Sequence, residues 1–351
     1  MSKPTIIIDS RIPFINGVLD DVANVLYLTA DEITPSAVKF VDALIIRTRT
    51  RCDAHLLANS SVKFIATATI GYDHIDTLYC AENHIQWVNA AGCNASSVAQ
   101  YMGSALAVWS HKTGHKLDGK TLGLVGVGQV GRAVFHLAKQ LGMNVILNDP
   151  PREQVEGSAN FVSLERLQQE ADIISFHTPL NSTGNFPTFH LASYDFFDHV
   201  VRSPLIINTA RGGIINEEAL KMALNSKKIS DVIIDCWENE PQIDTELLDK
   251  AMIATPHIAG YSADGKAKAT EMSVHAMSRF FHFGLDNFSV VQLKPRLKQV
   301  VKRAEWTELM MKNYAIITDD KSLRSNPKAF EQLRSSYPIR REVEWLVVED
   351  D

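Results

Sequence analysis

The chain has 351 residues, which is long enough for two domains and a small appendage. Its 45% hydrophobic and 22% charged residues are typical of a soluble globular protein. The formal net charge of −6 argues against a broad nucleic-acid surface, and no apolar run is long enough to span a membrane. The scattered cysteines form no C-x-x-C pair, so we expect reduced thiols and a cytoplasmic location.

The first ninety residues are predicted to form a small α/β unit. Its strands are expected at four short runs rich in β-formers, residues 5–9, 43–47, 62–67 and 85–88. The loop after the second run carries Arg47, Arg49 and Arg51 at alternate positions. This pattern fits a solvated strand edge and an anion-binding site equally well. The polar loop 67–76 follows a strand, where ligands gather in open α/β sheets.

Residues 121–151 predict a dinucleotide-binding βαβ unit. An apolar run leads into Gly126, Gly128 and Gly131, with the spacing G-x-G-x-x-G. These glycines permit a tight turn, close approach to a pyrophosphate and close helix packing. The next strand ends at Asp149, where a carboxylate can bind a ribose hydroxyl. Strand, glycines, helix and acid in this order favour a dinucleotide site over a purely structural turn.

The alternation of strands and helices continues beyond this unit. Strands are expected within 171–180, 204–208, 231–241 and 252–261, and helices within 163–171 and 216–227. A long helix is expected before the βαβ unit, within 91–115, and another at about 264–283. This order predicts a doubly wound parallel sheet. Near the C-terminus, alternating Val343, Trp345 and Val347 predict one more strand.

Three strand ends of the second half carry chemically useful side chains. Arg211, between a strand and two glycines, can bind a carboxylate with parallel charge-assisted bonds. His257 suits acid/base chemistry, and Glu240 can fix its tautomer. Each residue alone has a structural explanation; their placement beyond successive strands favours a catalytic set. His111 and His115 have no acidic third ligand nearby, so we expect no metal site.

The segments LVGVGQVGRAV, FHTPL, INTARGGIIN, DCWENEP and TPHIAGY resemble the D-isomer-specific 2-hydroxyacid dehydrogenase family. The resemblance implies a Rossmann nucleotide domain inserted into a smaller flavodoxin-like α/β substrate domain, with a small C-terminal α/β dimerisation region. The implied domains are 1–94 with 264–286 for the substrate, 95–263 for NAD, and 287–351 for dimerisation. The resemblance thus implies a homodimer, and the net charge and short apolar runs lead us to expect no nucleic-acid or membrane partner.

The resemblance also implies roles for individual residues. Arg211, Glu240 and His257 would form the catalytic set, with His257 as proton donor or acceptor. Besides the three glycines, NAD would contact Gln129, Val130, Asp149, Thr178, Asp235 and Gly260. Substrate contacts would fall on Thr48, Thr69 and Tyr261.

Further segments, including NDPPRE and FEQLRSSYPIRREVEW, resemble family members acting on a phosphorylated four-carbon 2-hydroxy acid. Because Arg211 can bind only one end of such a substrate, a second cation is required. We rank Arg47 first for the phosphate, and the pair Arg340 and Arg341 second. Two alternatives remain: a relative acting on phosphoglycerate, glyoxylate or hydroxypyruvate, and a non-catalytic NAD(H)-sensing scaffold.

Overall fold

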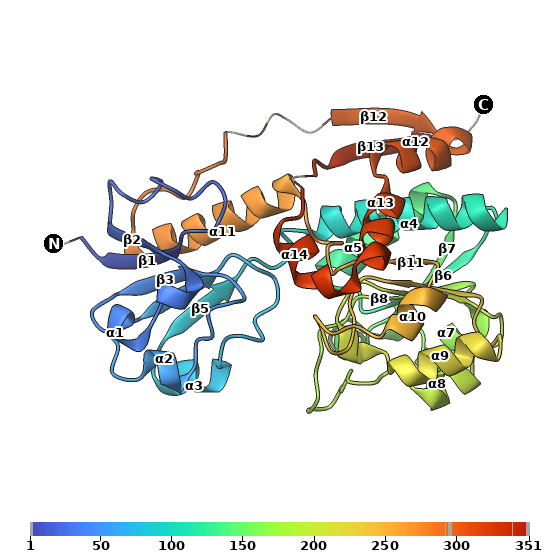
Figure 1. Cartoon of the computed structure of the whole chain (residues 1–351), viewed down its shortest axis with the longest axis horizontal. Coiled ribbons are helices and arrows are strands. Elements are labelled where there is room, and N and C mark those ends of the chain that lie inside the picture. Colours follow the sequence, from blue (N-terminus) through green and yellow to red (C-terminus); the bar gives the residue numbers. More distant parts are fainter. Residues whose placement is uncertain (1–2, 292, 294–296, 339, 349–351) are drawn as a thin grey trace. The chain divides into compact units, whose positions relative to one another are not determined.

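The computed structural model describes residues 3–291, 293, 297–338 and 340–348. The chain forms two compact units, one of Met1–Asn94 with Ser262–Pro295 and one of Ala95–Tyr261 with Arg296–Asp351 (Figure 1). The expected division into three domains, with a separate region at 287–351, stays a prediction. No helix in the described parts of the chain combines the length and hydropathy that a bilayer span requires.

The first unit contains a five-stranded parallel sheet in the order β2-β1-β3-β4-β5. This is the flavodoxin-like order, which confirms the predicted fold class. Strand β2 was not predicted, because its residues are only partly buried and show no apolar alternation. The strands are β1 (Thr5–Asp9), β2 (Asn24–Leu28), β3 (Ala43–Ile46), β4 (Phe64–Thr67) and β5 (Gln86–Asn89).

Alternate residues of these strands face opposite layers of helices. Ile7 points into a core formed with α1, α2 and α3, whereas Ile6 and Ile8 point into a core formed with α11. Near-continuous burial of the central strands follows from this two-sided cover. The helices are α1 (Pro35–Val38), α2 (Ala54–Leu57), α3 (Thr77–Glu82) and α11 (Ala263–Phe281).

The second unit contains a six-stranded parallel sheet in the order β11-β10-β9-β8-β6-β7. From β6 the chain moves to β7 on one side and then returns to β8 on the other, so the strand order reverses beside β6. Ligands of doubly wound sheets bind beyond the strand ends at such a point. The strands are β6 (Thr121–Val125), β7 (Asn144–Asn148), β8 (Ile173–Phe176), β9 (Leu205–Asn208), β10 (Asp231–Ile234) and β11 (Ile253–Ala254).

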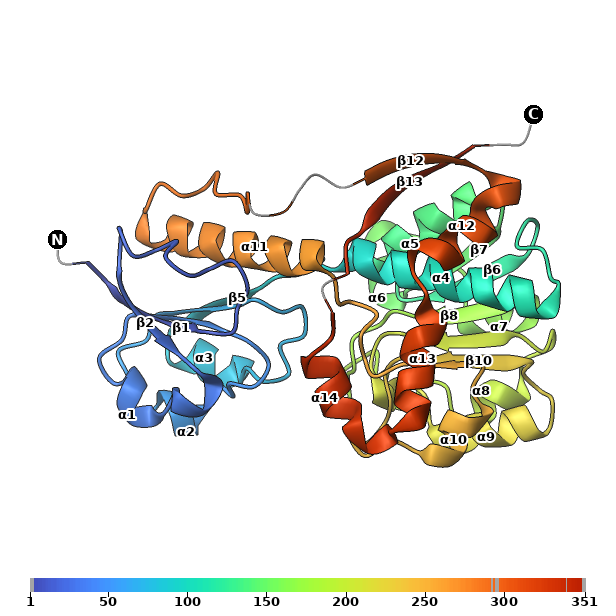
Figure 2. The ribbon, with the colours of Figure 1, turned by 45° about the horizontal axis from the view of Figure 1, so that its top comes forward.

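Helices cover both faces of this sheet, as the doubly wound prediction requires (Figures 1 and 2). Ile173 and the strand residues that point to the same face of the sheet pack against α4 and α5. Ile174 and the strand residues on the opposite face pack against α7 to α10. The helices are α4 (Ala95–Thr113), α5 (Gln129–Gln140), α6 (Pro150–Glu156), α7 (Leu164–Glu170), α8 (Tyr194–Asp198), α9 (Glu217–Asn225) and α10 (Thr245–Lys250).

The C-terminal segment packs on this second unit. Trp306 and Met310 of α12 lie against Gly103 of α4, where an added Cβ would be 2.8 Å from the Met310 Cε atom. On α13, the Asp320 carboxylate accepts a hydrogen bond from the Ala254 N–H, which covers part of the edge strand β11. The elements are β12 (Leu297–Lys302), α12 (Trp306–Asn313), α13 (Ile316–Ser325), α14 (Phe330–Ser335) and β13 (Val343–Val348).

Strand β13 confirms the strand predicted near the C-terminus, and it pairs in parallel with β12. Packing of α13 against the edge of the sheet also brings α14, which follows it, to the second unit (Figure 2). Short 3-10 helices complete the described elements: Ala30–Glu32, Ser158–Asn160, Gly212–Ile214, Arg303–Glu305 and Pro327–Ala329.

Candidate active site

The glycine loop lies where the strand order reverses. Gly126 follows β6 with φ +89°, a left-handed conformation that glycine adopts without strain. A Cβ at Gly131 would be 2.2 Å from the Gly126 carbonyl oxygen, so only glycine lets α5 approach the loop. A Cβ at Gly128 would meet nothing within 4 Å, which leaves the N-terminus of α5 open to a ligand. The predicted strand, turn and helix are therefore confirmed.

Two further groups at this edge fit a dinucleotide. The Thr178 hydroxyl is buried and makes no hydrogen bond within the described chain. Thr178 lies against Gly126 of the glycine loop. A bound polar group would satisfy that oxygen. Asp149 follows β7, and its carboxylate accepts hydrogen bonds from the N–H groups of Val127 and Arg152 at 2.8 and 3.2 Å. Asp149 thus fixes the glycine loop while occupying the position expected of a ribose ligand.

Arg152 is a cation close to the glycine loop. Pro150 and Pro151 begin α6, and the helix places Arg152 within its first turn. The Arg152 guanidinium donates a hydrogen bond to the Val127 carbonyl oxygen at 2.6 Å and pairs with Glu156 at 2.6 and 2.7 Å. Arg152 therefore lies at the glycine loop, with much of its charge balanced by Glu156.

We expect the enzyme to prefer NAD over NADP by at least about 100-fold in kcat/KM, because Asp149 repels the additional phosphate. Asp149→Ser should narrow that ratio, since serine still caps α6 but carries no charge. Steady-state kinetics with both cofactors measure the ratio, and Glu153→Gln, on the same helix, provides a control for charge alone. Equal kcat/KM values for NAD and NADP in the unmodified chain would contradict this assignment.

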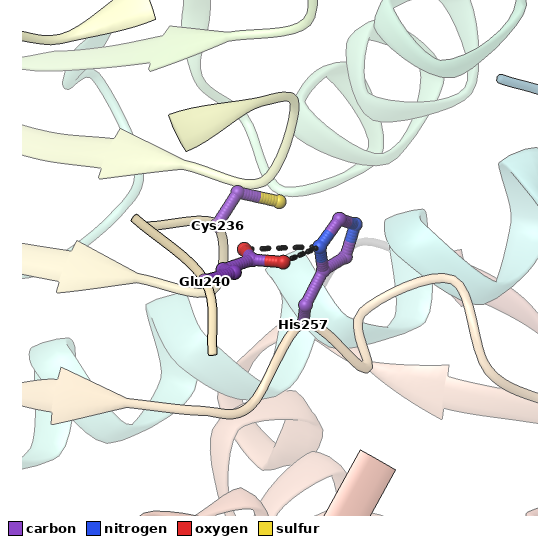
Figure 3. Close-up of side chains that lie close together, drawn as sticks. All are labelled: Cys236, Glu240 and His257. Carbon is purple, nitrogen blue, oxygen red and sulfur yellow. Dashed lines mark hydrogen bonds and ion pairs between the residues drawn. The ribbon is translucent and has the colours of Figure 1, made fainter. Parts of the chain in front are cut away.

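His257 and Glu240 form a hydrogen-bonded pair, as predicted (Figure 3). The His257 Nδ1 atom lies 2.8 and 3.0 Å from the two Glu240 carboxylate oxygens. The carboxylate therefore holds the proton on Nδ1 and leaves Nε2 for proton exchange with a substrate. Both side chains are about one-fifth exposed, 23% for His257 and 19% for Glu240, so the pair is shielded yet reachable.

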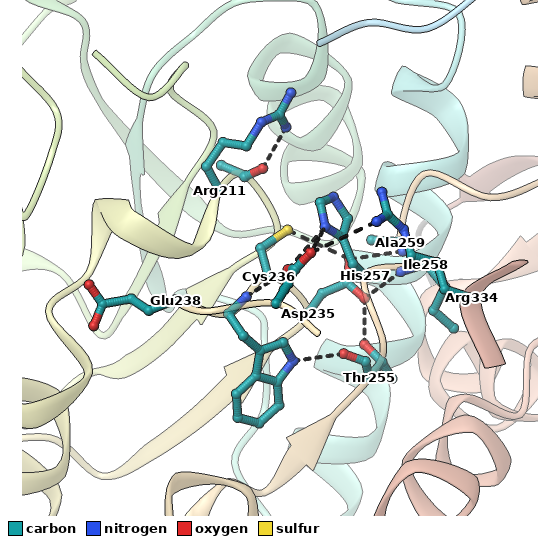
Figure 4. A network of polar contacts seen from close by, with 12 residues as sticks. Arg211, Asp235, Cys236, Glu238, Thr255, His257, Ile258, Ala259 and Arg334 are labelled. Atoms are coloured by element: carbon teal, nitrogen blue, oxygen red, sulfur yellow. Dashed lines mark hydrogen bonds and ion pairs between the residues drawn. The ribbon is translucent and has the colours of Figure 1, made fainter. Parts of the chain in front are cut away.

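Asp235 holds the loop that carries His257. Its carboxylate is 1% exposed and accepts hydrogen bonds from the Thr255 hydroxyl and the N–H groups of Ile258 and Ala259 (Figure 4). His257 itself has φ +54°, a left-handed conformation uncommon outside glycine. Such backbone outliers concentrate at functional sites. The sequence did not reveal this supporting role, and the predicted contact of Asp235 with NAD stays a prediction.

The charge of Glu240 is maintained despite burial. Burial alone would raise its pKa, but hydrogen bonding and charge from His257, the Trp237 N–H and the charge of Arg334 together lower the pKa of Glu240 below its ordinary value. Cys236 lies beside the pair, and ligand-capable atoms of the three residues are all within 4.8 Å of one another. Burial raises the pKa of the Cys236 thiol well above its usual range, so it is protonated and a poor metal ligand.

Arg211 follows β9 on a loop that packs tightly against the Glu240 loop. A Cβ at Gly212 would lie 1.7 Å from the Trp237 carbonyl oxygen, so the glycine is required for this approach. One Arg211 Nη atom donates a hydrogen bond to the Ala210 carbonyl oxygen at 2.7 Å. Figure 4 shows Arg211 and His257 in one view with their network. All three predicted catalytic residues thus come from strand ends of one sheet.

The predicted substrate residues divide between the two units. Thr48 is exposed in the first unit, where the Thr69 hydroxyl contacts the Thr67 hydroxyl and the Gly71 carbonyl oxygen at 2.7 and 3.0 Å. Arg47 forms a bidentate ion pair, at 3.0 and 3.2 Å, with the fully buried carboxylate of Asp9. Its charge is therefore already balanced, which weakens the case for Arg47 as the phosphate ligand.

Of the two C-terminal arginines ranked second for the phosphate, Arg340 has contacts that the structure describes. Arg340 stacks on Tyr314 and donates hydrogen bonds to Gln100, Ser97 and the Ala259 carbonyl oxygen within its own chain. Arg340 therefore fixes the C-terminal segment to α4 and to the loop that follows His257. Arg334 on α14, which the sequence did not single out, lies with one Nη atom 4.0 Å from a Glu240 oxygen. Only the packing of α13 and α14 brings Arg334 there.

Comparison with known proteins agrees with this geometry. A family profile described as D-isomer specific 2-hydroxyacid dehydrogenase, NAD binding domain, matches residues 94–259. The erythronate-4-phosphate dehydrogenase of Bacteroides fragilis strain ATCC 25285 is 50% identical over 338 residues, covering 96% of this chain and 97% of that protein. The enzyme of the same name from Porphyromonas gingivalis is 38% identical, covering 98% of this chain and 95% of that protein.

Solved structures show the same fold. D-lactate dehydrogenase from Aquifex aeolicus, complexed with NAD and lactic acid, has a TM-score of 0.67 and 23% identity, covering 83% of this chain and all of that one. NAD-bound 3-phosphoglycerate dehydrogenase from Entamoeba histolytica has a TM-score of 0.67 and 25% identity, covering 82% of this chain and 99% of that one. The chain belongs to the erythronate-4-phosphate dehydrogenase family, within the NAD-dependent D-isomer specific 2-hydroxyacid dehydrogenases.

Proposed function

We propose that this enzyme oxidises 4-phospho-D-erythronate with NAD, giving 2-oxo-3-hydroxy-4-phosphobutanoate in pyridoxine biosynthesis. The observation that carries the proposal is the His257–Glu240 pair, held at the strand ends of the sheet that also carries Arg211 and the glycine loop. Near-full-length relatives bearing the erythronate-4-phosphate dehydrogenase name support the choice of substrate.

In this reaction His257 accepts the proton of the C2 hydroxyl through Nε2. The imidazolium that results is stabilised by Glu240, whose carboxylate lies 2.8 Å from Nδ1. Arg211 binds the substrate carboxylate and orients C2, which is a positioning effect. The glycine loop, Thr178 and Asp149 would hold NAD, which would supply the acceptor for the hydride of C2. The alcohol thereby loses one hydride and one proton and becomes a ketone.

We further propose that the enzyme is cytoplasmic and forms a homodimer through its C-terminal region. The four cysteines support the first point, because all are buried, free thiols. The homodimer is supported by the two-stranded sheet of β12 and β13, which exposes Leu297 and Val300. A sheet of two strands is only marginally stable unless it packs against another element.

The proposal predicts that NADH forms fastest with 4-phospho-D-erythronate among 2-hydroxy acids. The decisive panel includes D-erythronate, 3-phosphoglycerate, D-glycerate and D-lactate at equal concentrations, with NADH absorbance as the readout. A kcat/KM at least about 100-fold higher for the phosphorylated four-carbon acid is expected, since two charge-assisted bonds to phosphate contribute roughly 3 kcal/mol or more. A higher kcat/KM with 3-phosphoglycerate than with 4-phospho-D-erythronate would assign this chain another activity of the same family. No turnover of any acid would favour the non-catalytic NAD(H)-sensing scaffold.

A further inference from the structure

The proposed substrate carries anions at both ends, and only one end is accounted for by Arg211. A phosphate monoester bears a charge of about −1.5 to −2 at neutral pH. If it is desolvated, it requires charged donors of its own. Arg47 is committed to Asp9 at 3.0 and 3.2 Å, and Arg340 is committed to Gln100 and Ser97 at 2.6 and 2.8 Å. The phosphate ligand is therefore to be sought among other cations.

Arg334 is a cation at the catalytic pair. Its Nη1 atom is 4.0 Å from a Glu240 oxygen, longer than the 2.7–2.9 Å of a charge-assisted hydrogen bond, so this ion pair is loose. The Arg334 Nε atom is buried and makes no hydrogen bond within the described chain. The side chain is 26% exposed, which leaves part of the guanidinium accessible. The Nε atom of Arg340 is also buried without a hydrogen bond in the described chain. The Arg340 Nη atoms, however, donate three hydrogen bonds and Arg47 has a bidentate ion pair with Asp9, whereas the Arg334 ion pair is loose.

Tyr261, the expected substrate residue, lies against the same guanidinium. The Arg334 Cζ atom is 6.0 Å from the centre of the Tyr261 ring, and the two side chains share a hydrogen bond. Figure 4 shows the His257 ring between the guanidinium groups of Arg211 and Arg334. Both arginines also act electrostatically on the Cys236 thiol beside that ring. Two cations therefore flank the group that exchanges the proton.

We propose that Arg334 binds the substrate phosphate together with Tyr261, while Arg211 binds the carboxylate. This inference rests on the proposed function and identifies the residue that distinguishes the phosphorylated substrate. The C-terminal segment is then part of the active site, because Asp320 and Arg324 fix α13 to the Ala254 N–H and to the Leu248 and Ala251 carbonyl oxygens. Helix α14 follows directly and presents Arg334.

The test compares two substrates in the full-length enzyme, 4-phospho-D-erythronate and D-erythronate. Arg334→Gln should raise KM for the phosphorylated acid about 100-fold, and it should change KM for D-erythronate by less than about threefold. Arg334→Lys should give an intermediate loss, because lysine keeps the charge without the planar fork. Lys328→Gln is the matched control: it removes an exposed charge from the segment just before α14 and should change neither value.

Two additional measurements separate binding from indirect effects. Inorganic phosphate should inhibit the unmodified enzyme competitively against the phosphorylated acid, and this inhibition should weaken in Arg334→Gln. NADH binding, followed by fluorescence, should stay intact and so exclude unfolding. Equal losses for both substrates, or a pH–rate profile displaced equally for both, would show that Arg334 acts only through Glu240 and would overturn the inference. Failure of the unmodified enzyme to oxidise 4-phospho-D-erythronate would instead overturn the proposed function.

Discussion

His257→Ala is expected to lower kcat by about 10²–10⁴-fold while leaving NAD affinity largely unchanged, because positioned proton transfer contributes a factor of that size. Glu240 fixes the Nδ1 atom of His257 at a distance of 2.8 Å, and the Nε2 atom of the imidazole is therefore left for the substrate. Its backbone is held through the N–H donated to the Asp235 carbonyl oxygen at 2.9 Å, so the loop should keep its shape.

The measurement is kcat with saturating NAD and substrate, together with a direct titration of NADH binding. His199→Ala is a suitable control, because this histidine lies on the surface of the same unit with a side chain 62% exposed. Its removal should leave kcat unchanged. Unaltered turnover in His257→Ala would remove His257 from the acid/base role, and loss of NADH binding would show damage to the fold instead.

Glu240→Gln is expected to lower kcat by about 10²-fold or more and to displace the pH–rate profile, since a carboxylate that orients and stabilises an imidazolium is worth up to roughly 10⁴-fold in related arrangements. Glutamine can still accept the hydrogen bond that the Trp237 N–H donates at 2.9 Å. It cannot stabilise the positive charge on His257. The loss of the carboxylate charge beside His257 should therefore displace the acidic limb of the pH–rate profile from that of the unmodified enzyme.

The same substitution has a consequence for stability. Glu240 has a pKa below its ordinary value of 4.5, so its carboxylate stabilises the folded chain above that pH. That contribution is lost as the pH falls through the lowered folded-state value. The unfolding free-energy difference between the unmodified chain and Glu240→Gln should therefore shrink on acidification.

Glu238→Gln is the matched control for the effect on the pH–rate profile. Glu238 lies on the same loop and pairs with His190, not with His257. Its substitution should leave the acidic limb of the rate profile in place. A profile for Glu240→Gln that overlays the unmodified enzyme would contradict the assigned role of this carboxylate.

Local signals explain why the nucleotide unit could be predicted from the sequence. The strand, three glycines, helix and Asp149 lie within about thirty residues, and each has a backbone or hydrogen-bonding reason for its position. The strand ends carrying Arg211, Glu240 and His257 were recognisable because parallel strands place their carboxyl ends at one edge. Strand β2 escaped notice because it is only partly buried and lacks apolar alternation.

Contacts between distant segments could not be predicted. The pairing of Arg47 with Asp9 joins residues 38 positions apart, and neither local sequence pattern indicates this contact. Arg334 reaches Glu240 across nearly a hundred residues, only because α13 docks on β11 through Asp320. Such pairings depend on how helices pack, which periodicity alone does not determine.

Hydride transfer from C2 of 4-phospho-D-erythronate is the central claim, and substrate deuterated at C2 tests it most directly. With NAD and the unmodified enzyme, mass spectrometry of the reduced cofactor should find one deuterium on the nicotinamide ring, with the 2-oxo acid formed in equal amount. His257→Ala should form both products by the same transfer, but slowly. Reduced cofactor without deuterium, or no reduced cofactor with this substrate, would contradict the account.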